Sequence, residues 1–533
     1  MRFGPDNMDF ERTNECHSSR TKLLAVVIVA VMALSALALF PGEQSDADGK
    51  TVTVNTWGEL EEELKHLEDG ETIILGADIK MDKDDGITIG DVRNLTIDLG
   101  GHVLERGPGG RGYAETGQIK FESGAVATVK NGTLKGGCYD NGAGLYIKDG
   151  CSITLENVNI TGSYASEEGG GIFIKGSTLA IKGGEISKCD AEDDGGFLRA
   201  TDSSTVTIEN VKFNENDSNE NGGAISADDG TTLTITNCEF KNSFSDDDGG
   251  AIYIEETGSV DIVGCKFISN KGCGRGGAVC IDSTGTVNIK GCTFESNQCG
   301  SDYDWDDGGA LYIEDSKVII GPNGDAGCIF TGNKALVNGG AIRIYGGDVE
   351  IRGTEFGSNF ATGSGGAVYV TDDGKLLLED CKISKNKAEG NYGGILIGDD
   401  ANVKMQGSVY ILENEWGSDM KGFLGVSNVF IEGSNLIECG TFKDGTQIGI
   451  DLEKKDRVFT KGYQSSNPDK DPTAFFKTED GYYVAQDPDS KEVRFYGGTS
   501  GDMSDNTIWI VVGIIAAIAV LGIAVYFVRF RKP

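Results

Sequence analysis

Acidic residues recur in short runs that precede a repeated Gly-Gly dipeptide. The runs are Asp193-Asp194, Asp246-Asp247-Asp248 and Asp306-Asp307. If the repeats stack, these carboxylates lie ~5 Å apart and repel one another, and a Ca²⁺ ion, which takes oxygen ligands, relieves that repulsion. The second and third runs are therefore candidate calcium ligands. The alternative is a solvated acidic edge, which we favour because the spacing matches neither an EF-hand loop nor the nonapeptide calcium repeat. No other cofactor is expected.

A second candidate site is an insertion in the glycine motif, which lengthens one interval to 32 residues. The insertion contains Tyr303, Asp304, Trp305 and Asp306. Aromatic rings beside polar groups suit stacking on sugars, and insertions in repeat proteins form loops that often line the binding face. We keep two interpretations open, a ligand-binding loop and an ordinary loop with Trp305 folded back on the protein.

Thirteen cysteines raise the question of disulfides. Five of them precede a repeated Phe or Ile by two residues, a place that Val158 and Val211 occupy in other repeats. These five are Cys238, Cys265, Cys292, Cys328 and Cys381. A place shared with valine indicates buried packing and not cross-linking. Cys273 and Cys299, which lie 26 residues apart in turns, are the best pair for a disulfide.

Other chemistry is scarce or nonspecific. Four sequons, at Asn94, Asn131, Asn159 and Asn216, permit N-glycans, although an Asn- and Thr-rich chain produces such matches by chance. Only three histidines are present among 533 residues, which makes serine-histidine and cysteine-histidine nucleophiles improbable. Acidic residues exceed basic ones by 37, so binding to nucleic acid is disfavoured.

The elements that position these residues follow from a repeat of about 27 residues. A Gly-Gly-Ala-Ile motif or a close variant begins at Gly142, Gly169, Gly195, Gly222, Gly249, Gly276, Gly308, Gly339, Gly365 and Gly393. Each copy is followed by apolar residues that alternate with a period of two, which predicts strands and not helices. Three short strands per unit cannot bury their own apolar face and must stack on neighbouring units. The sequence therefore predicts an all-β, right-handed parallel β-helix with three strands per coil.

Stacking in register places equivalent side chains above one another. An internal aromatic ladder is predicted from Phe213, Phe240, Phe267, Phe294, Phe330 and Phe356. A ladder of amides at the following turn is predicted from Asn216, Asn270, Asn297, Asn333, Asn359 and Asn386. Each amide can hydrogen-bond to the backbone of the next coil.

Two tetrapeptides together resemble a known family. The pair Gly249-Gly250-Ala251-Ile252 and Phe267-Ile268-Ser269-Asn270 is similar to the repeat of the polymorphic outer membrane proteins, which are bacterial surface adhesins. The resemblance covers roughly residues 140–400 and implies surface display and adhesion. Those proteins end in an autotransporter-like membrane domain, whereas this chain ends in a single apolar segment, so their secretion route does not carry over.

Two apolar runs indicate export and membrane attachment. Residues 23–40 carry no charge and follow Arg20 and Lys22, which predicts a signal sequence or a signal anchor. Residues 507–528 are uncharged and precede a basic tail, which predicts a transmembrane helix with a cytoplasmic C-terminus. We therefore expect residues 48–506 at the cell surface. The expected segments are 1–47 (signal or anchor), 48–105 (N-terminal cap and first coils), 106–440 (repeats), 441–506 (β cap or stalk), 507–528 (transmembrane helix) and 529–533 (tail).

The function expected from these features is a non-enzymatic adhesin or recognition rod that binds glycans or proteins on a host or neighbouring cell. Many right-handed β-helices are polysaccharide lyases or hydrolases, which makes such an enzyme the main alternative, and a purely structural envelope protein is a third. An enzyme needs a cluster of catalytic side chains that interrupts the repeat. The arginines available for such a cluster, Arg199, Arg275 and Arg343, lie in different coils. Carboxylate pairs are too common here to discriminate.

Overall fold

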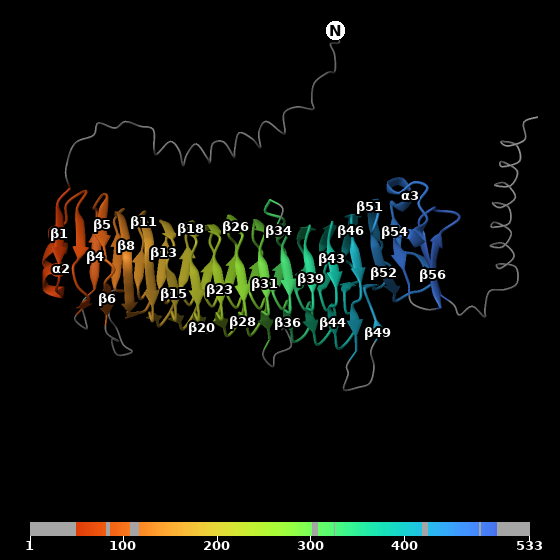
Figure 1. Ribbon diagram of the computed structural model, residues 1–533, viewed down its shortest axis with the longest axis horizontal. Helices are drawn as coiled ribbons and strands as arrows, with labels where there is room; N and C mark the ends of the chain where they lie inside the picture. Colours follow the sequence, from red (N-terminus) through yellow and green to blue (C-terminus); the bar gives the residue numbers. More distant parts are fainter. Residues whose placement is uncertain are drawn as a thin grey trace, which may run out of the picture. The chain divides into compact units, whose positions relative to one another are not determined.

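The computed structural model describes residues 49–81, 86–106, 117–300, 307–324, 326–417, 425–478 and 481–497 (Figure 1). From Lys50 onward the described residues belong to one compact unit. The predicted signal sequence and transmembrane helix, at 23–40 and 507–528, lie outside these ranges. Within them, no helix has the length and apolar character needed to cross a membrane.

A typical coil in the middle of the solenoid contains four strands. In a typical coil these are β25 (Ile252–Glu255), β26 (Ser259–Val263), β27 (Lys266–Ile268) and β28 (Lys271–Gly272). The first three are the predicted strands, whereas the fourth, of only two residues, was expected to be part of a turn. Such a short strand has no apolar periodicity of its own and forms because the coils above and below offer backbone partners in register.

Equivalent strands pair in parallel from coil to coil and form sheets A, B and C. Sheet A contains strands equivalent to β26 and β27, sheet B those equivalent to β25, and sheet C those equivalent to β28. Sheets A and B join through β52 (Gln447–Leu452) into one 42-stranded sheet. The result is a right-handed parallel β-solenoid of about 14 turns, which confirms the predicted fold (Figure 1).

Sheet B carries the candidate site. Besides part of β52, it consists of β4 (Ile87–Gly90), β7 (Ile119–Glu122), β10 (Leu145–Ile147), β13 (Ile172–Lys175), β17 (Leu198–Thr201), β21 (Ile225–Ala227), β25, β29 (Val279–Asp282), β33 (Leu311–Glu314), β37 (Ile342–Tyr345), β41 (Val368–Thr371), β45 (Ile395–Ile397) and β50 (Val429–Ile431).

Sheet C has twelve strands of two residues each. They are β9 (Cys138–Tyr139), β12 (Tyr164–Ala165), β16 (Asp190–Ala191), β20 (Asp217–Ser218), β24 (Phe244–Ser245), β28, β32 (Gln298–Cys299), β36 (Lys334–Ala335), β40 (Phe360–Ala361), β44 (Lys387–Ala388), β48 (Glu415–Trp416) and β49 (Gly425–Val426).

The Gly-Gly corner leads the chain from sheet C into sheet B. Gly249 has a φ of +67°, and a Cβ placed there would lie 2.3 Å from the carbonyl oxygen of Ile252. A Cβ on Gly250 would lie 2.3 Å from the carbonyl oxygen of Gly277 in the next coil. The first glycine is therefore required by conformation and the second by the close approach of two backbones.

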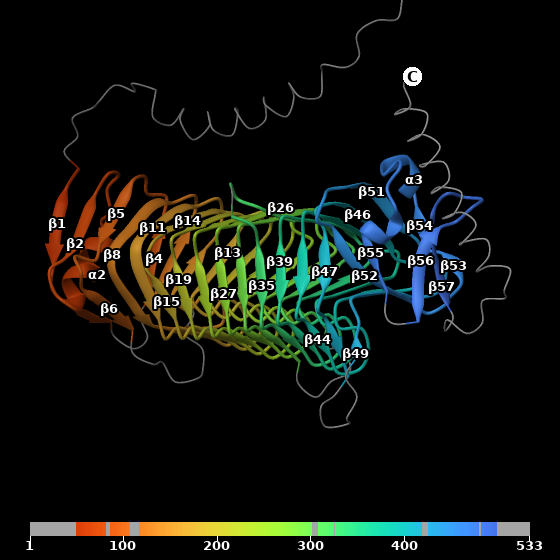
Figure 2. The same cartoon turned by 45° about the vertical axis from the view of Figure 1, so that its right-hand side comes forward.

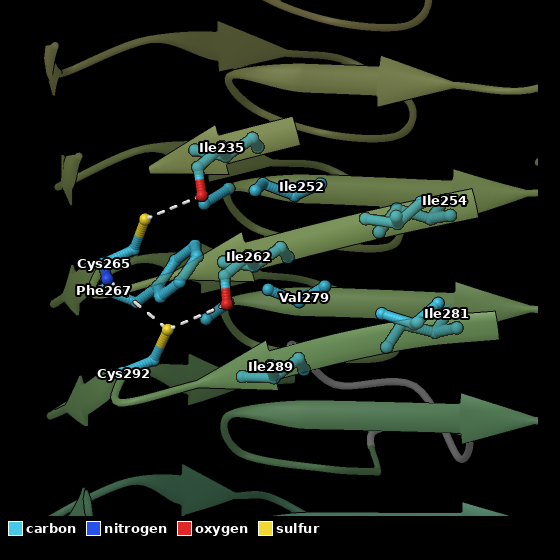
Figure 3. Packing of buried hydrophobic residues seen from close by; sticks show 14 of the residues in the cluster. Ile235, Ile252, Ile254, Ile262, Cys265, Phe267, Val279, Ile281, Ile289 and Cys292 are labelled. Atoms are coloured by element: carbon cyan, nitrogen blue, oxygen red, sulfur yellow. Dashed lines mark hydrogen bonds between the residues drawn. The ribbon is translucent and has the colours of Figure 1, made fainter. Parts of the chain in front are cut away.

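The predicted aromatic ladder is present in the core. The rings of Phe213, Phe240, Phe267, Phe294, Phe330 and Phe356 stack nearly parallel, with centroids 4.4 to 4.9 Å apart. All six side chains are buried, together with the aliphatic residues of sheets A and B that surround them (Figure 3). Stacking at the strand spacing makes the ladder a direct consequence of the register.

The amide ladder is also confirmed, and it is longer than predicted. The Oδ1 atom of Asn333 accepts hydrogen bonds from the backbone N–H and from Nδ2 of Asn297, both at 3.0 Å. Its own Nδ2 donates to the Asn359 Oδ1 atom and to the Phe294 carbonyl oxygen. The same pattern continues beyond the predicted members to Asn414 and Asn428.

The five aligned cysteines are buried and free, which confirms their interpretation as core residues. Each sulfur also hydrogen-bonds to the backbone. Cys292 Sγ accepts from the Cys265 backbone N–H at 3.4 Å and donates to the Ile262 carbonyl oxygen at 3.4 Å (Figure 3). These thiols therefore satisfy polar backbone groups at the turn, a role that the valines in other coils cannot perform.

The solenoid is closed at its N-terminal end by α2 (Trp57–Leu64). The Thr56 Oγ1 atom accepts a hydrogen bond from the Glu59 N–H at 3.3 Å, and Leu60 is buried in the core. At the C-terminal end, the parallel pairing extends past the expected limit at 440, as far as β55 (Phe476–Lys477).

A small β region follows the last coil. Its antiparallel sheet consists of β53 (Arg457–Val458), β57 (Val493–Gly497) and β56 (Tyr482–Gln486) (Figure 2). Two short helices, α3 (Tyr463–Ser466) and the 3₁₀ helix η2 (Pro472–Ala474), lie in the same region.

The buried thiols should resist alkylation. Burial raises the pKa of the Cys328 thiol and raises that of Cys381 to about 12, so little thiolate exists at pH 8. In the folded full-length chain we expect no iodoacetamide adduct on either residue after an hour at pH 8, and complete labelling in urea, as measured by peptide mass spectrometry. Rapid labelling of the folded chain would contradict the packing described above.

Replacing one rung of the amide ladder should destabilise the solenoid. Asn333→Ala leaves the Asn297 N–H and Nδ2 groups and the Phe294 carbonyl without their partner, which should cost about 3 kcal/mol. The exposed Asn402→Ala is the control and should change stability by less than about 0.5 kcal/mol. Urea denaturation followed by circular dichroism measures both, and equal midpoints would contradict the role of the ladder.

Candidate functional site

The outer face of sheet B carries a row of side chains that does not repeat. In β25, Ile252 and Ile254 face the core, so Tyr253 between them faces outward. Strand register places the following residues above one another with Tyr253: Tyr146, Phe173, Arg199, Ser226, Cys280, Tyr312, Arg343 and Tyr369. We call this set the outer row. Tyr253, Cys280 and Tyr312 pack in a cluster separate from the main core.

A second polar ladder borders this row at the Gly-Gly corner. Its members directly precede the first glycine of each corner. A side-chain oxygen of a member in one coil accepts a hydrogen bond from the backbone N–H of the member in the next coil. Asp248 Oδ1 accepts from the Arg275 N–H at 2.6 Å, and Asp307 Oδ1 accepts from the Asn338 N–H at 2.8 Å. Asp194 and Asn221 continue this corner ladder in the same way. The acidic runs therefore contribute directly to coil stacking.

The remaining carboxylate oxygens of the corner ladder bind arginines. Asp248 Oδ2 accepts from Arg275 Nε at 2.8 Å, and Asp307 Oδ2 accepts from Arg343 Nε at 2.9 Å. The Arg343 guanidinium also lies over the Tyr369 ring, 4.2 Å from its centroid, while that of Arg275 lies 4.9 Å from the Tyr312 centroid. Each arginine is thus held both by a carboxylate and by an aromatic ring.

A similar cluster forms around Arg199, nearer the N-terminal end. Arg199 Nε donates to the Glu168 carboxylate at 3.1 Å, and Nη1 donates to the Ser226 hydroxyl at 3.0 Å. A short ion pair joins the same guanidinium to Asp228. Burial raises the pKa of Glu168, and the positive charge of Arg199 opposes that shift.

A cavity of about 370 Å³ opens on the outer face between the second and third arginines. Its lining consists of Arg275, Asp307, Tyr312, Glu314, Arg343 and Tyr345. Glu314 is held by two of these residues, since Arg275 Nη1 lies 2.6 Å and the Tyr312 hydroxyl 3.2 Å from its Oε2 atom. Tyr345 is 38% exposed and offers its ring to solvent. The arrangement combines aromatic faces with fixed donors and acceptors.

Negative charge exceeds positive charge along this face. Asp282 lies opposite Glu255 on one side and Glu314 on the other, one coil away in each case. Burial and the charges of Asp282 and Asp228 raise the pKa of Glu255. Burial likewise raises the pKa of Asp307, although Arg343 opposes the shift. An anionic ligand is therefore disfavoured at this face.

The predicted calcium site is not assembled. Asp248 and Asp307 use their oxygens for backbone N–H groups and arginines, and Asp246 and Asp247 are exposed. Asp306 lies outside the described residues. Nowhere in the described ranges do three Asp, Glu, His or Cys side chains form a group able to hold a metal ion. Arginines therefore neutralise Asp248 and Asp307, the two members of these runs that accept hydrogen bonds from backbone N–H groups.

Other predicted sites have mixed outcomes. The loop with Tyr303, Asp304, Trp305 and Asp306 lies outside the described residues, so its binding role stays a prediction. The sequon asparagines Asn94, Asn131 and Asn159 are exposed, whereas Asn216 is buried and donates to the Ile186 carbonyl. A glycan on Asn216 is therefore incompatible with the folded ladder.

The disulfide predicted between Cys273 and Cys299 also stays a prediction. In sheet C, the residue paired with Cys299 is Gly272 and not Cys273. The Cys299 sulfur lies 2.7 Å from the Gly274 carbonyl oxygen and 3.2 Å from that of Asp307. These contacts direct the sulfur toward the backbone of the corner.

Sequence reasoning missed the cavity because it treated the arginines as isolated. Arg275 and Arg343 belong to different coils, yet both line the same space. A signal was available in the third residue after each Gly-Gly pair. In successive repeats this residue is Tyr253, Cys280, Tyr312, Arg343 and Tyr369. Variation at this place, between two constant apolar residues, distinguishes the outer row from the core.

Comparison with known families agrees with the fold. The family model described as a right handed beta helix region matches residues 118–294, 218–318 and 277–469, which together span more than half of the chain. No curated protein matches the sequence.

The charge excess on sheet B should make stability depend on pH. Because the pKa of Glu255 is raised, the folded chain binds more protons than the unfolded chain just above the ordinary glutamate pKa. The contribution of Glu255 to stability is complete below the ordinary glutamate pKa. It is lost as the pH rises through the higher pKa of Glu255 in the folded chain. Glu255→Gln should therefore raise the melting temperature at pH 7 and leave it nearly unchanged at pH 4.

The control for this experiment is Glu209→Gln, an exposed glutamate on sheet A. It should have no effect at either pH when melting is followed by differential scanning calorimetry. A lower melting temperature of the Glu255→Gln variant at pH 7 would contradict the proposed repulsion.

Proposed function

Because the chain belongs to the right-handed β-helix family, we propose that it is a cell-surface recognition rod that binds glycans along the outer face of sheet B without cleaving them. The β-helix fold is common both in surface proteins and in polysaccharide-active enzymes. The choice between these classes therefore has to come from the residues of the site.

The observation that carries the proposal is the cavity beside Arg275, Tyr312 and Arg343. Aromatic faces stack on the apolar side of a sugar ring, while guanidinium and carboxylate groups hydrogen-bond to its hydroxyls. Tyr345 supplies the exposed ring of the cavity, whereas Tyr253 and Tyr312 are buried. A chain of sugars has contacts available in several consecutive coils.

Binding without cleavage is supported by the state of the carboxylates. A glycosidase needs one carboxylic acid that gives a proton and a second carboxylate that acts as base or nucleophile. In the cavity, Asp307 is bound to Arg343 and to a backbone N–H, and Glu314 to Arg275 and Tyr312. Both acids are held in fixed roles that favour hydrogen bonding to hydroxyls over proton transfer.

Surface display is part of the proposal and is supported by the sequence alone. The apolar runs at 23–40 and 507–528 are compatible with export and a membrane anchor, and the tetrapeptide repeat is similar to that of bacterial adhesins. The partners proposed are uncharged glycans, free or on glycoproteins, of a host or neighbouring cell. The negative face disfavours uronate polymers and nucleic acids.

A panel of neutral and anionic polysaccharides tests the proposal with the full-length chain. We expect retention of a neutral glycan without released fragments, and Tyr345→Ala should weaken retention about tenfold because it removes the exposed ring of the cavity. Tyr410→Ala on sheet A is the matched control and should leave retention unchanged.

Two results would overturn this function. Fragment release that disappears in Glu314→Gln or Asp307→Asn would identify a lyase or hydrolase. Absence of retention on every glycan, with the chain folded by circular dichroism, would favour a purely structural envelope protein.

A further inference from the structure

A second cavity lies at the C-terminal end of sheet C, away from the outer row. There β48 pairs with β49 in antiparallel orientation, and the parallel stacking of sheet C ends. The cavity has a volume of about 560 Å³, and its lining includes Leu412, Trp416, Ser427, Asn428, Ile450 and Lys477. It lies where the parallel stacking of sheet C stops, and β49, the last strand of that sheet among the described residues, contributes to its lining.

The amide ladder ends in this cavity with a hydrogen-bond donor. From Asn270 onward, every Nδ2 group donates to Oδ1 of the next asparagine, so all the side-chain hydrogen bonds run in one direction. Asn428 is the last member, and its Oδ1 accepts from both the N–H and Nδ2 of Asn414. Its Nδ2 group meets no hydrogen-bond acceptor among the described residues.

The position of that Nδ2 group follows from its neighbours. Since two donors of Asn414 fix the oxygen of Asn428, the nitrogen must face the other way. Gly449, which also lines the cavity, lies against it, and a Cβ at Gly449 would be 2.3 Å from Nδ2. A row of aligned amides polarises its terminal member, so this N–H is a stronger donor than an isolated amide.

A second polar group without a partner stands beside it. Ser427 is only 6% exposed, and its Oγ atom is buried without a hydrogen bond. A buried hydroxyl without a partner is costly and uncommon, which indicates that a ligand atom completes it. Ser427 and Asn428 are consecutive residues, and both line the cavity.

The rest of the described lining is largely apolar, and its two charged groups already have partners. Leu412 and Ile450 supply aliphatic walls and Trp416 an aromatic one. Asp451 is bound to Lys455 and to the Leu452 N–H, and Lys477 Nζ donates a hydrogen bond to the Thr473 carbonyl oxygen at 2.6 Å. Since both charged groups are engaged by other residues, the unpartnered polar atoms of the lining favour a neutral ligand with a donor and an acceptor.

We propose that this cavity binds the acetamido group of an N-acetylated sugar. The acetamido carbonyl accepts from Asn428 Nδ2, and its N–H donates to Ser427 Oγ. The methyl group packs against Leu412 and Ile450, and the sugar ring stacks on Trp416. This site does not depend on the function proposed for sheet B, since it shares no residue with that cavity.

Calorimetric titration of the full-length chain tests the assignment, with the trimer of N-acetylglucosamine as the probe and the trimer of glucose with the same linkage as the control ligand. We expect the N-acetylated trimer to bind at least about tenfold more tightly, because only it completes the two polar groups. An acetylated, amidated glycine tests whether an amide without a sugar suffices, and it should bind more weakly than the trimer.

Three variants locate the site. Asn428→Asp keeps the oxygen that accepts from Asn414 but replaces the donor, so affinity should fall at least about tenfold. Ser427→Ala should weaken binding by a similar factor without lowering the melting temperature, because it removes a hydroxyl that has no partner in the free protein. Glu209→Gln, on the exposed side of sheet A, is the control and should not change the affinity.

Equal affinity for the two trimers would overturn the proposal, as would no measurable binding of the N-acetylated trimer. Unchanged affinity in both Ser427→Ala and Asn428→Asp would place binding elsewhere and would also overturn it. Tighter binding of the acetylated glycine than of the sugar would replace the sugar by a peptide as ligand.

Discussion

The register between successive coils depends on side chains that hydrogen-bond to the backbone of the next coil. The asparagines of the amide ladder and the carboxylates of the corner ladder each accept from an N–H one coil away. A shift of one residue would bury these amides and carboxylates without partners, at a cost of several kcal/mol per coil. The phenylalanine stack, the buried thiols and the Gly-Gly corners all require the same register, so these polar ladders determine the architecture as a whole.

Both candidate sites arise where this regularity is interrupted. On sheet B, the core-facing residues repeat from coil to coil, but the residues between them vary and bring arginines, tyrosines and acids together. At the end of sheet C, the amide ladder stops at Asn428 and leaves its polarised end without a neighbour. A solenoid satisfies its internal polar groups by repetition, and a ligand can compete for them only where the repetition changes or stops.

The acidic runs illustrate how one residue type takes different roles. Asp248 and Asp307 were interpreted as solvated or calcium-binding carboxylates, yet each binds an N–H with one oxygen and an arginine with the other. The arginines come from the corner ladder or the outer row of a neighbouring coil. Distance along the chain concealed this pairing, because residues 27 or more positions apart become neighbours once coils stack.

The sequence by itself determined the right-handed β-helix, the two internal ladders and the buried cysteines. These features repeat or follow local rules, so strand periodicity and interval length are enough to predict them. Only the tertiary structure decided the two-residue strands of sheet C, the cavity between Arg275 and Arg343, and the open end of the amide ladder at Asn428. Each of these three features depends on contacts between coils or on the place where stacking ends, and none of them is encoded in the pattern of a single repeat.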